Sequence, residues 1–161
     1  MRWAFGVVLA FLSGFLVAQI NFPRPQGTTT KATVVRVIDG DTISVRVEGE
    51  TKPVTVRIIG YDAPEKDQPF GETATKFLRA LLEGREIILE SDAQALDRYG
   101  RRLYHVWVSP TLVSELMLLS GLGAQMTIPP NVRHAEWLSR AQRLGREIGL
   151  GIWAKGGEKS E

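Results

Sequence analysis

The sequence predicts a mainly β domain of the α+β class, in which a five-stranded barrel carries three packed helices and follows an N-terminal hydrophobic helix. Two patterns lead to this prediction. Five short segments are β-branched or alternate between apolar and polar residues, as half-buried strands do. Three longer segments repeat apolar residues at the spacing of an amphipathic helix. With 161 residues, 43% of them hydrophobic, the chain suffices for one such domain and an extension.

The N-terminus, residues 1–22, is predicted to be directed to a membrane. Arg2 precedes an apolar run over residues 3–20, and about 18 residues is near the lower limit for a helix that spans a bilayer. A cleaved signal peptide and an uncleaved signal-anchor transmembrane helix both fit this pattern. Leu16 is a poor residue at position −3 of a cleavage site, which favours the anchor. With Arg2 inside the cell, the positive-inside rule predicts an extracytoplasmic domain, either membrane-anchored or secreted.

Residues 23–31 are expected to be a linker, because prolines, a glycine and a run of threonines follow the apolar segment. The folded domain is expected over residues 32–154, and residues 155–161 form a polar C-terminal tail. The chain has no cysteine, which excludes a disulfide framework, a thiol nucleophile and a cysteine zinc site.

The first half of the domain reads as three strands joined by short turns. Thr33–Ile38 is β-branched and breaks at the turn signal Asp39-Gly40. Thr42–Val47 and Val54–Ile58 both alternate, and Arg57 points away from the apolar face of the third strand. The short connections between these segments predict a β-meander.

In the second half of the domain, the apolar residues first repeat at helical spacing, and strand-like and helical segments then follow. Gly71–Glu83 repeats apolar residues at helical spacing, and Gly84 is a natural C-terminal stop. Two strands and two helices follow, at Glu86–Glu90, Leu103–Val108, Thr111–Ser120 and Val132–Ile148. The predicted buried stripe of the last helix is Leu138, Ala141, Leu144 and Ile148. This order of elements fits an OB-type fold, a small five-stranded barrel with helices packed on it.

The overall positive charge comes from the N-terminal part of the chain. The net charge is +2, but all 18 acids lie after residue 30, whereas Arg2 and Arg24 precede it. The remaining bases and acids are equal in number, so attraction to nucleic acid must come from a local patch. The last predicted helix is locally basic, and a solvated face is favoured over a nucleic-acid track for Arg133, Arg140, Arg143 and Arg146.

Acids and arginines gather near the ends of the predicted strands: Asp39, Asp41, Asp62, Glu65, Arg57 and Arg101. Calcium and magnesium take hard oxygen ligands, and Asp41 and Asp62 are the candidate direct ligands, with Asp39 as a supporting or water-mediated partner. Glu65, in the stiff loop after Pro64, could take a proton from water. Arginine forks match phosphate oxygens and stabilise a charged transition state. The combination predicts metal-assisted attack on a phosphodiester.

Each of these residues also has a purely structural explanation. Asp39-Gly40 is an ordinary hairpin turn, and Asp62-Ala63-Pro64-Glu65 can be a plain loop. Asp41 could cap the turn, and Arg57 could be a solvated strand residue. Their joint spacing favours chemistry over these separate explanations.

With these residues at this spacing, the sequence resembles the staphylococcal nuclease (thermonuclease) family. The resemblance extends from about Ala32 to Trp153. The motifs that carry the resemblance are Asp39-Gly40-Asp41-Thr42, Arg57-Ile58, Asp62-Ala63-Pro64-Glu65 and Asp97-Arg98-Tyr99-Gly100-Arg101. The resemblance implies an OB-fold barrel with three helices. It also implies calcium-dependent cleavage of DNA and RNA that leaves 3′-phosphate ends.

The resemblance implies a metal site. Asp41 and Asp62 match the calcium-ligating aspartates of the family. Ala63 stands where the best-known members have threonine, and its backbone carbonyl would be a further calcium ligand. Asp39 and Thr42 would support these ligands from the surrounding shell.

The resemblance also implies how a phosphate is held and attacked. Glu65 matches the proposed general base. Arg57 and Arg101 match the phosphate-binding arginines, which would also stabilise the transition state. Tyr99 matches a tyrosine beside the phosphate. The implied partner is DNA or RNA, bound by a monomer that contacts a membrane through its N-terminal segment if that segment is uncleaved.

Two departures from the family pattern bear on substrate binding. The stretch Lys66–Phe70 is short compared with the flexible loop of some relatives. The segment Gly123–Pro130 lacks the tyrosines that flank the base in the best-known member, which affects affinity or base preference because base stacking contributes about 1–3 kcal/mol. The alternative function is therefore a membrane-tethered OB-fold module that binds nucleic acid without turnover.

The two histidines do not suggest a metal site. His105 is expected on a strand and His134 in the exposed first turn of the last helix, far apart in the sequence. Trp137 and Trp153 are expected to be packing residues and not stacking platforms.

Overall fold

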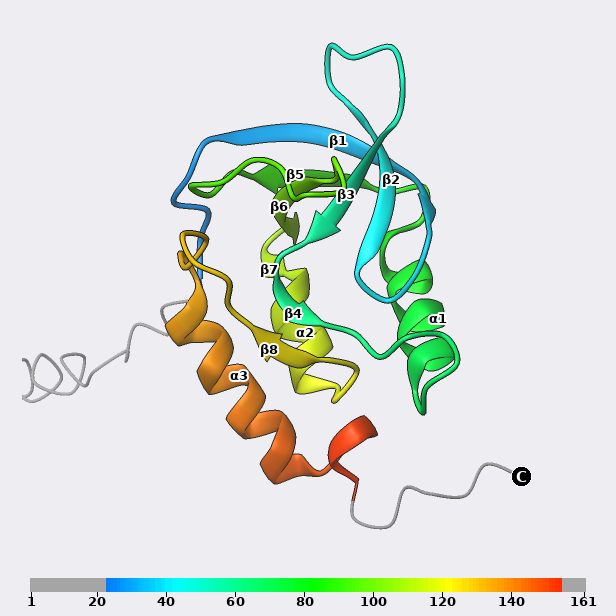
Figure 1. Ribbon diagram of the computed structural model, residues 1–161, viewed down its shortest axis with the longest axis vertical. Coiled ribbons are helices and arrows are strands. Elements are labelled where there is room, and N and C mark those ends of the chain that lie inside the picture. The colour runs from blue at the N-terminus through cyan, green and yellow to red at the C-terminus, as the bar shows by residue number, and fades with distance from the viewer. Residues whose placement is uncertain (1–22, 155–161) are drawn as a thin grey trace, which may run out of the picture.

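The computed structural model describes residues 23–154, so the predicted N-terminal membrane segment and the polar C-terminal tail lie outside the described residues. The barrel strands are β1 (Thr29–Val37), β2 (Thr42–Val47), β3 (Val54–Ile58), β5 (Glu86–Glu90) and β6 (Arg102–Val108). The helices are α1 (Gly71–Leu82), α2 (Val113–Leu119) and α3 (Ala135–Ile148). Figure 1 shows α1 at one side of the barrel and α2 and α3 beyond one end. The predicted fold class is confirmed.

Within residues 23–154, no helix combines the length and the apolar character that a membrane crossing requires.

Pairing between strands that are distant in the sequence closes the barrel. β1 pairs antiparallel with both β2 and β5, and β6 pairs antiparallel with β5 and parallel with β3. β1 pairs with β5 over Thr29–Thr33 and with β2 over Ala32–Val37, and the register of the second pairing shifts between Val34 and Arg36. In the closing pair, Arg57 lies opposite Leu103. The closure therefore brings the third strand beside the loop that carries Arg101.

Two short strands that the sequence did not predict form a separate ribbon beside the barrel (Figure 1). β4 (Gly60–Asp62) pairs antiparallel with β8 (Ala124–Met126), and Tyr61 lies opposite Gln125. Gly60 has a φ angle of 101°, which a residue with a side chain rarely adopts. A Cβ atom at Gly60 would also lie 2.4 Å from a methyl carbon of Leu138. Gly60 thus allows the chain to turn from β3 into β4 against α3.

Two helices begin later than the sequence predicts. Thr111–Leu112 forms the short strand β7 against β6, and α2 therefore begins at Val113. α3 begins at Ala135, whose N–H donates to the carbonyl of Val132 in a preceding turn. A short 3-10 helix, η1 (Gly151–Trp153), follows α3.

The predicted buried stripe of α3 is correct at its start and wrong at its end. Leu138 and Ala141 are buried, but Leu144 and Ile148 are 48% and 53% exposed. Gly145 takes their place in the contact, since a Cβ atom there would lie 2.3 Å from the carbonyl oxygen of Leu118 in α2. The close approach of the two helices at Gly145 rotates the larger apolar side chains toward solvent.

The hydrophobic core fills the barrel and the space between the barrel and its helices. Fully buried side chains of the strands include Ile43, Val45, Val56, Ile58, Leu89 and Val106. α1 adds Ala74, Leu78 and Leu82, which lie on one face of the helix as its apolar spacing predicts. The strand ends around this core carry the polar residues of the candidate site.

Candidate active site

The turn between β1 and β2 holds two of the predicted acids. Asp41 is only 8% exposed, and its two carboxylate oxygens accept hydrogen bonds from Thr42 Oγ1 at 3.0 Å and from the N–H of Ala63 at 3.1 Å. Asp39 Oδ1 accepts a hydrogen bond from the N–H of Asp41 at 3.1 Å. The turn and the start of the loop after β4 therefore hold the Asp41 carboxylate from two sides.

Arg57 joins the two predicted direct ligands. Its Nη2 atom lies 3.0 Å from Oδ2 of Asp41 and 2.8 Å from Oδ1 of Asp62. Its Nη1 atom donates to the carbonyls of Ile58 at 2.6 Å and Tyr61 at 3.2 Å. Because both carboxylates contact one nitrogen, they cannot lie farther apart than the sum of those two distances. The structure thus brings Asp41 and Asp62 together, although Asp41 lies in the turn before β2 and Asp62 lies at the end of β4.

The electrostatics of Asp41 favour a cation nearby. Burial, together with a smaller effect of the Asp39 charge, raises its pKa from 3.8 to about 6 against the opposing effects of Arg57 and the Ala63 N–H. Arg57 is shared with Asp62, so its charge compensates the buried carboxylate only in part. Hard oxygen donors with uncompensated negative charge fit a divalent cation such as calcium.

A metal at this position would need further ligands. Among the described residues, no group of three or more Asp, Glu or His side chains converges closely enough to hold a metal ion. Backbone carbonyls, water and substrate oxygens commonly complete the coordination of calcium and magnesium. The N–H of Ala63 bonds to Asp41, which places this residue beside the acid.

Glu65 lies in a compact, exposed loop before α1. Its N–H donates to Oε1 of Gln68, and its carbonyl accepts from the N–H of Gln68, at 2.8 and 2.9 Å. Gly71 packs closely on this loop, since a Cβ atom there would lie 1.8 Å from the Glu65 carbonyl oxygen. Among residues 23–154, no hydrogen bond or ion pair holds the Glu65 carboxylate. These contacts therefore order the backbone of Glu65, while its side chain faces solvent.

The loop between β5 and β6 is organised by Asp97, whose importance the sequence analysis missed. Asp97 Oδ1 accepts the N–H groups of Tyr99 and Arg101, both at 2.9 Å, and Oδ2 lies 2.7 Å from Nε of Arg101. Burial alone would raise the pKa of Asp97, but these hydrogen bonds and the Arg101 charge lower it. The spacing of Asp97 and Arg101 in a turn was the available signal.

Two guanidinium groups lie over the exposed ring of Tyr99. The distances from the ring centroid to the guanidinium carbons are 4.8 Å for Arg98 and 5.5 Å for Arg101, within cation–π range. Nη2 of Arg98 also donates to the Tyr99 hydroxyl at 2.6 Å. The aromatic ring therefore orders two positive charges at the edge of the site.

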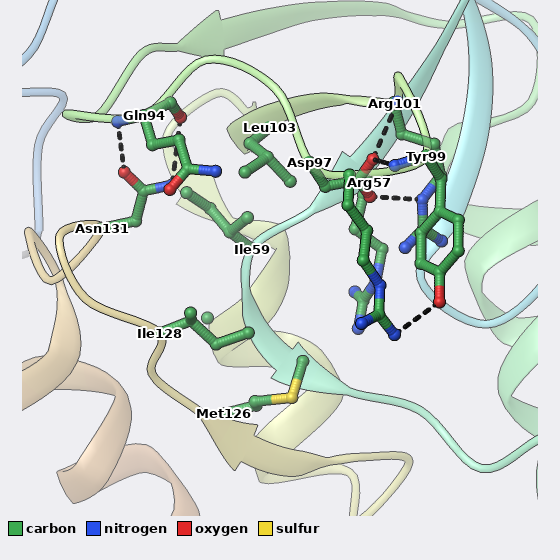
Figure 2. Close-up of a pocket in the computed structure, with 12 residues that line it drawn as sticks. Arg57, Ile59, Gln94, Asp97, Tyr99, Arg101, Leu103, Met126, Ile128 and Asn131 are labelled. Carbon is green, nitrogen blue, oxygen red and sulfur yellow. Dashed lines mark hydrogen bonds and ion pairs between the residues drawn. The ribbon is translucent and has the colours of Figure 1, made fainter.

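A cavity of about 410 Å³ is lined by Arg57 and by the loop that carries Asp97, Tyr99 and Arg101, whereas Asp41, Asp62 and Glu65 are not among its lining residues (Figure 2). Figure 2 shows Arg57, Arg101 and Tyr99 grouped at one end of the cavity. The apolar residues between the two ends are Ile59, Leu103, Met126 and Ile128. The far end carries Gln94 and Asn131, which exchange backbone–side-chain hydrogen bonds of 2.7 and 3.1 Å. A cavity with a cationic end and an apolar middle suits an anion that carries an apolar or planar group.

Both histidines are buried, and they lie together. His134, predicted to be exposed, is only 3% exposed, and its Nε2 atom lies 2.8 Å from Oε2 of Glu90. Nε2 of His105 lies 3.1 Å from Oδ2 of Asp92, and the two rings are 4.7 Å apart. The prediction for His134 was wrong because the turn before α3 folds back onto β5 and β6, which no local pattern reveals. Each histidine ring contacts a carboxylate inside the fold, Asp92 or Glu90.

The chain is similar to known proteins over much of its length. Residues 55–155 match the family model described as staphylococcal nuclease homologue. A thermonuclease of Staphylococcus hyicus is 36% identical over 127 residues, which cover 75% of this chain and 74% of that protein. A thermonuclease of Staphylococcus intermedius is 34% identical over 128 residues, covering 76% and 75%. Endonuclease YncB of Bacillus subtilis (strain 168) is 34% identical over 142 residues, covering 83% and 66%.

Proposed function

Because this chain belongs to the staphylococcal nuclease family and is a nuclease of the hydrolase class, we propose that it hydrolyses phosphodiester bonds of DNA, RNA or both with the aid of calcium. The observation that carries the proposal is the convergence of Asp41 and Asp62 on Arg57, at the end of a cavity that Arg101 also lines. Acids for a cation and arginines for a phosphate thus share one site.

Asp41 and Asp62 would hold the calcium ion, together with the backbone carbonyl of Ala63. Bound there, the ion would polarise the phosphate that is attacked. Asp39 and Thr42 support the site through the hydrogen bonds that they make with Asp41. Such supporting contacts orient ligands and tune their affinity for the metal.

Arg57 and Arg101 would bind the phosphate and stabilise the negative charge that grows on it during attack. Both side chains line the cavity, and each is held by an aspartate, Asp62 or Asp97. An arginine that is already oriented loses little conformational freedom when the transition state forms. This organisation supports the two arginines as catalytic residues.

Glu65 would remove a proton from the attacking water. Its side chain is exposed, and Gln68 and Gly71 order the backbone that carries it. In-line attack with departure of the 5′ oxygen would leave a 3′-phosphate end. Tyr99 would contact the nucleotide at the rim of the cavity.

The second candidate is a module that binds nucleic acid without turnover. The observation in its favour is that Met126 and Ile128, and not aromatic residues, face the middle of the cavity. A base would then be held by apolar contact and would lose part of the stacking energy. The complete set of acids and arginines favours cleavage.

The experiment uses single-stranded DNA and RNA oligonucleotides with the purified protein, in calcium or in a calcium chelator. We expect cleavage only with calcium, and products whose 3′ ends a polymerase extends only after phosphatase treatment. Arg101→Gln should lose activity, whereas Arg46→Gln, which removes an exposed charge from β2, should not. Binding without calcium-dependent cleavage would establish the second candidate instead.

We further propose that the protein acts outside the cytoplasm as a monomer, either anchored by its N-terminal segment or secreted after cleavage. The support is the pattern of Arg2 and the apolar residues 3–20. Mass spectrometry of the mature N-terminus distinguishes the two forms, and light scattering of the purified domain tests the oligomeric state.

A further inference from the structure

We propose that Tyr61 is a positioning residue of the candidate active site, because its hydroxyl group fixes the peptide plane that carries Asp41. Tyr61 is fully buried on β4, and its hydroxyl donates to the carbonyl oxygen of Gly40 at 2.8 Å. That carbonyl belongs to the turn between Asp39 and Asp41. The inference rests on the proposed function only where it treats Asp41 as a metal ligand.

The Gly40–Asp41 peptide is held on both of its edges. Tyr61 binds its carbonyl, and Oδ1 of Asp39 accepts its N–H at 3.1 Å. In a trans peptide the C=O and N–H groups point in opposite directions from one rigid plane. Bonds on both sides therefore prevent the plane from rotating. The direction in which the Asp41 side chain leaves the backbone depends on that plane.

The tyrosine ring is itself held in place. A Cβ atom at Gly123 would lie 2.7 Å from Cδ2 of Tyr61, so only glycine leaves room for the ring there. A Cβ atom at Gly40 would likewise lie 2.6 Å from the Cβ of Ala63. The ring thus packs closely on Gly123, and the turn packs closely on Ala63 at Gly40. These contacts restrain the ring, and with it the position of its hydroxyl.

Tyr61 also contacts the phosphate-binding side of the site. Its carbonyl accepts a hydrogen bond from Nη1 of Arg57 at 3.2 Å. The same residue therefore touches the acid-bearing turn through its side chain and the buried arginine through its backbone. It also directly precedes Asp62. This links the relative placement of the two acids to the position of a single strand residue.

A simpler explanation is that a buried tyrosine hydroxyl must find some acceptor, whatever its effect on the site. The two explanations differ in what Tyr61→Phe changes. If the hydroxyl only satisfies its own hydrogen bond, its removal alters stability alone. If it positions Asp41, its removal also weakens metal binding in protein that is still folded. Contacts that orient metal ligands typically change affinity by about 10–100-fold.

The first test measures terbium luminescence and calcium competition for the wild type and Tyr61→Phe. We expect the variant to bind about 10–100-fold more weakly. Ser114→Ala is the matched control, since the Ser114 hydroxyl is also buried and donates to a backbone carbonyl, that of Ile59, at 2.8 Å. The control should keep wild-type affinity. Equal affinity of folded Tyr61→Phe and wild type would overturn the proposal.

The second test needs no metal, so it separates this inference from the proposed function. Hydrogen exchange followed by NMR reports the Asp41 amide, which should exchange faster in Tyr61→Phe and remain protected in Ser114→Ala. If the wild type binds neither terbium nor calcium, the metal assignment fails while faster exchange still supports positioning. Unchanged exchange in the tyrosine variant refutes it.

A pair of variants at the half-buried Asp39 covers the case in which Tyr61→Phe does not fold. Asp39→Ala and Asp39→Asn both remove one negative charge, but only asparagine keeps an oxygen that can accept the Asp41 N–H. The alanine variant should therefore bind terbium more weakly than the asparagine variant. Equal affinities would show that holding the peptide plane does not matter for the site.

Discussion

Arg57 and Asp41 form an ion pair between two nearly buried side chains, with 3.0 Å between Nη2 and Oδ2. Asp41 follows the turn after β1, and Arg57 lies on β3, where it also contacts Asp62 at 2.8 Å. Arg57 therefore has two roles. It compensates in part the charges of buried Asp41 and of the more exposed Asp62, and it lines the cavity in which a phosphate is expected to bind.

Replacing Arg57 with alanine is expected to reduce stability as well as activity. Asp41 would remain as a buried carboxylate without its cation, which typically costs about 3–5 kcal/mol of unfolding free energy. Arg101→Ala is the comparison, because its side chain is 31% exposed. That variant should lose about 3 kcal/mol of transition-state stabilisation, but less than about 1 kcal/mol of stability. Urea unfolding and cleavage rates measure both quantities, and equal stability losses would contradict the structural role of Arg57.

Replacing Glu65 with glutamine is expected to slow cleavage by about 10²–10⁴-fold, because glutamine cannot accept the proton from water. Stability should not change, since the side chain is exposed. Asp67→Asn, in the same exposed loop, is the control for the loss of one charge. Single-turnover rates at saturating calcium give the comparison. Wild-type rates in the Glu65 variant would show that another group acts as the base.

An aromatic residue at position 128 is expected to strengthen substrate binding. Ile128 lines the cavity and is 60% exposed, so a tyrosine ring there has room to stack on a base. Such stacking contributes about 1–3 kcal/mol per base. Leu144→Tyr, on the exposed face of α3, is the control. Fluorescence anisotropy with a single-stranded oligonucleotide in chelator measures the dissociation constants, and equal gains in both variants would argue against the cavity as the base site.

Glu90 is expected to make the stability of the fold depend on pH. Its buried carboxylate accepts hydrogen bonds from Trp107, His134 and the N–H groups of Gln26 and Gly27. Burial alone would raise its pKa, but these hydrogen bonds lower it from 4.5 to about 2. A lowered pKa in the folded state means that the ionised form stabilises the fold above the unfolded pKa. That stabilisation is lost as the pH falls from about 4.5 toward 2.

Glu90→Gln should therefore be less stable than the wild type at neutral pH, by about 3 kcal/mol for a broken buried pair. The difference should shrink as the pH falls below 4.5, the ordinary value for this group. Glu86→Gln, at an exposed acid on the same strand, should show neither effect. Thermal unfolding across this pH range is the measurement. A difference that stays constant in acid would mean that the ionised state of Glu90 is not what stabilises the fold.

The barrel strands were predictable because their signals are local. The alternation at Thr42–Val47 and Val54–Ile58 matches β2 and β3 at both ends. The helical spacing after Gly71 likewise predicted α1 to within one residue. The candidate site residues were also readable, since Asp41, Arg57 and Asp62 stand at strand ends whose positions the same patterns indicate.

Errors arose where contacts between distant segments override the local pattern. Thr111–Leu112 has helical neighbours but pairs with β6, and Leu144 has the spacing of a core residue but is displaced by the close contact at Gly145. His134 is buried because the turn before α3 packs on Glu90. These long-range contacts leave the spacing of apolar residues in the sequence unchanged. That spacing therefore cannot distinguish the observed structure from the predicted one.

From the sequence alone came the five barrel strands, the three helices, the acid and arginine motifs, and the family. The tertiary structure determined that these motifs lie close together. Arg57 reaches Asp41 through the pairing of β2 and β3, and it reaches the Arg101 loop through the parallel pairing of β3 and β6 that closes the barrel. Tyr61 reaches Gly40 from the β4–β8 ribbon, which no sequence pattern predicted. Distances between residues far apart in the chain depend on this closure, which is why the cavity and the positioning of Asp41 became visible only in three dimensions.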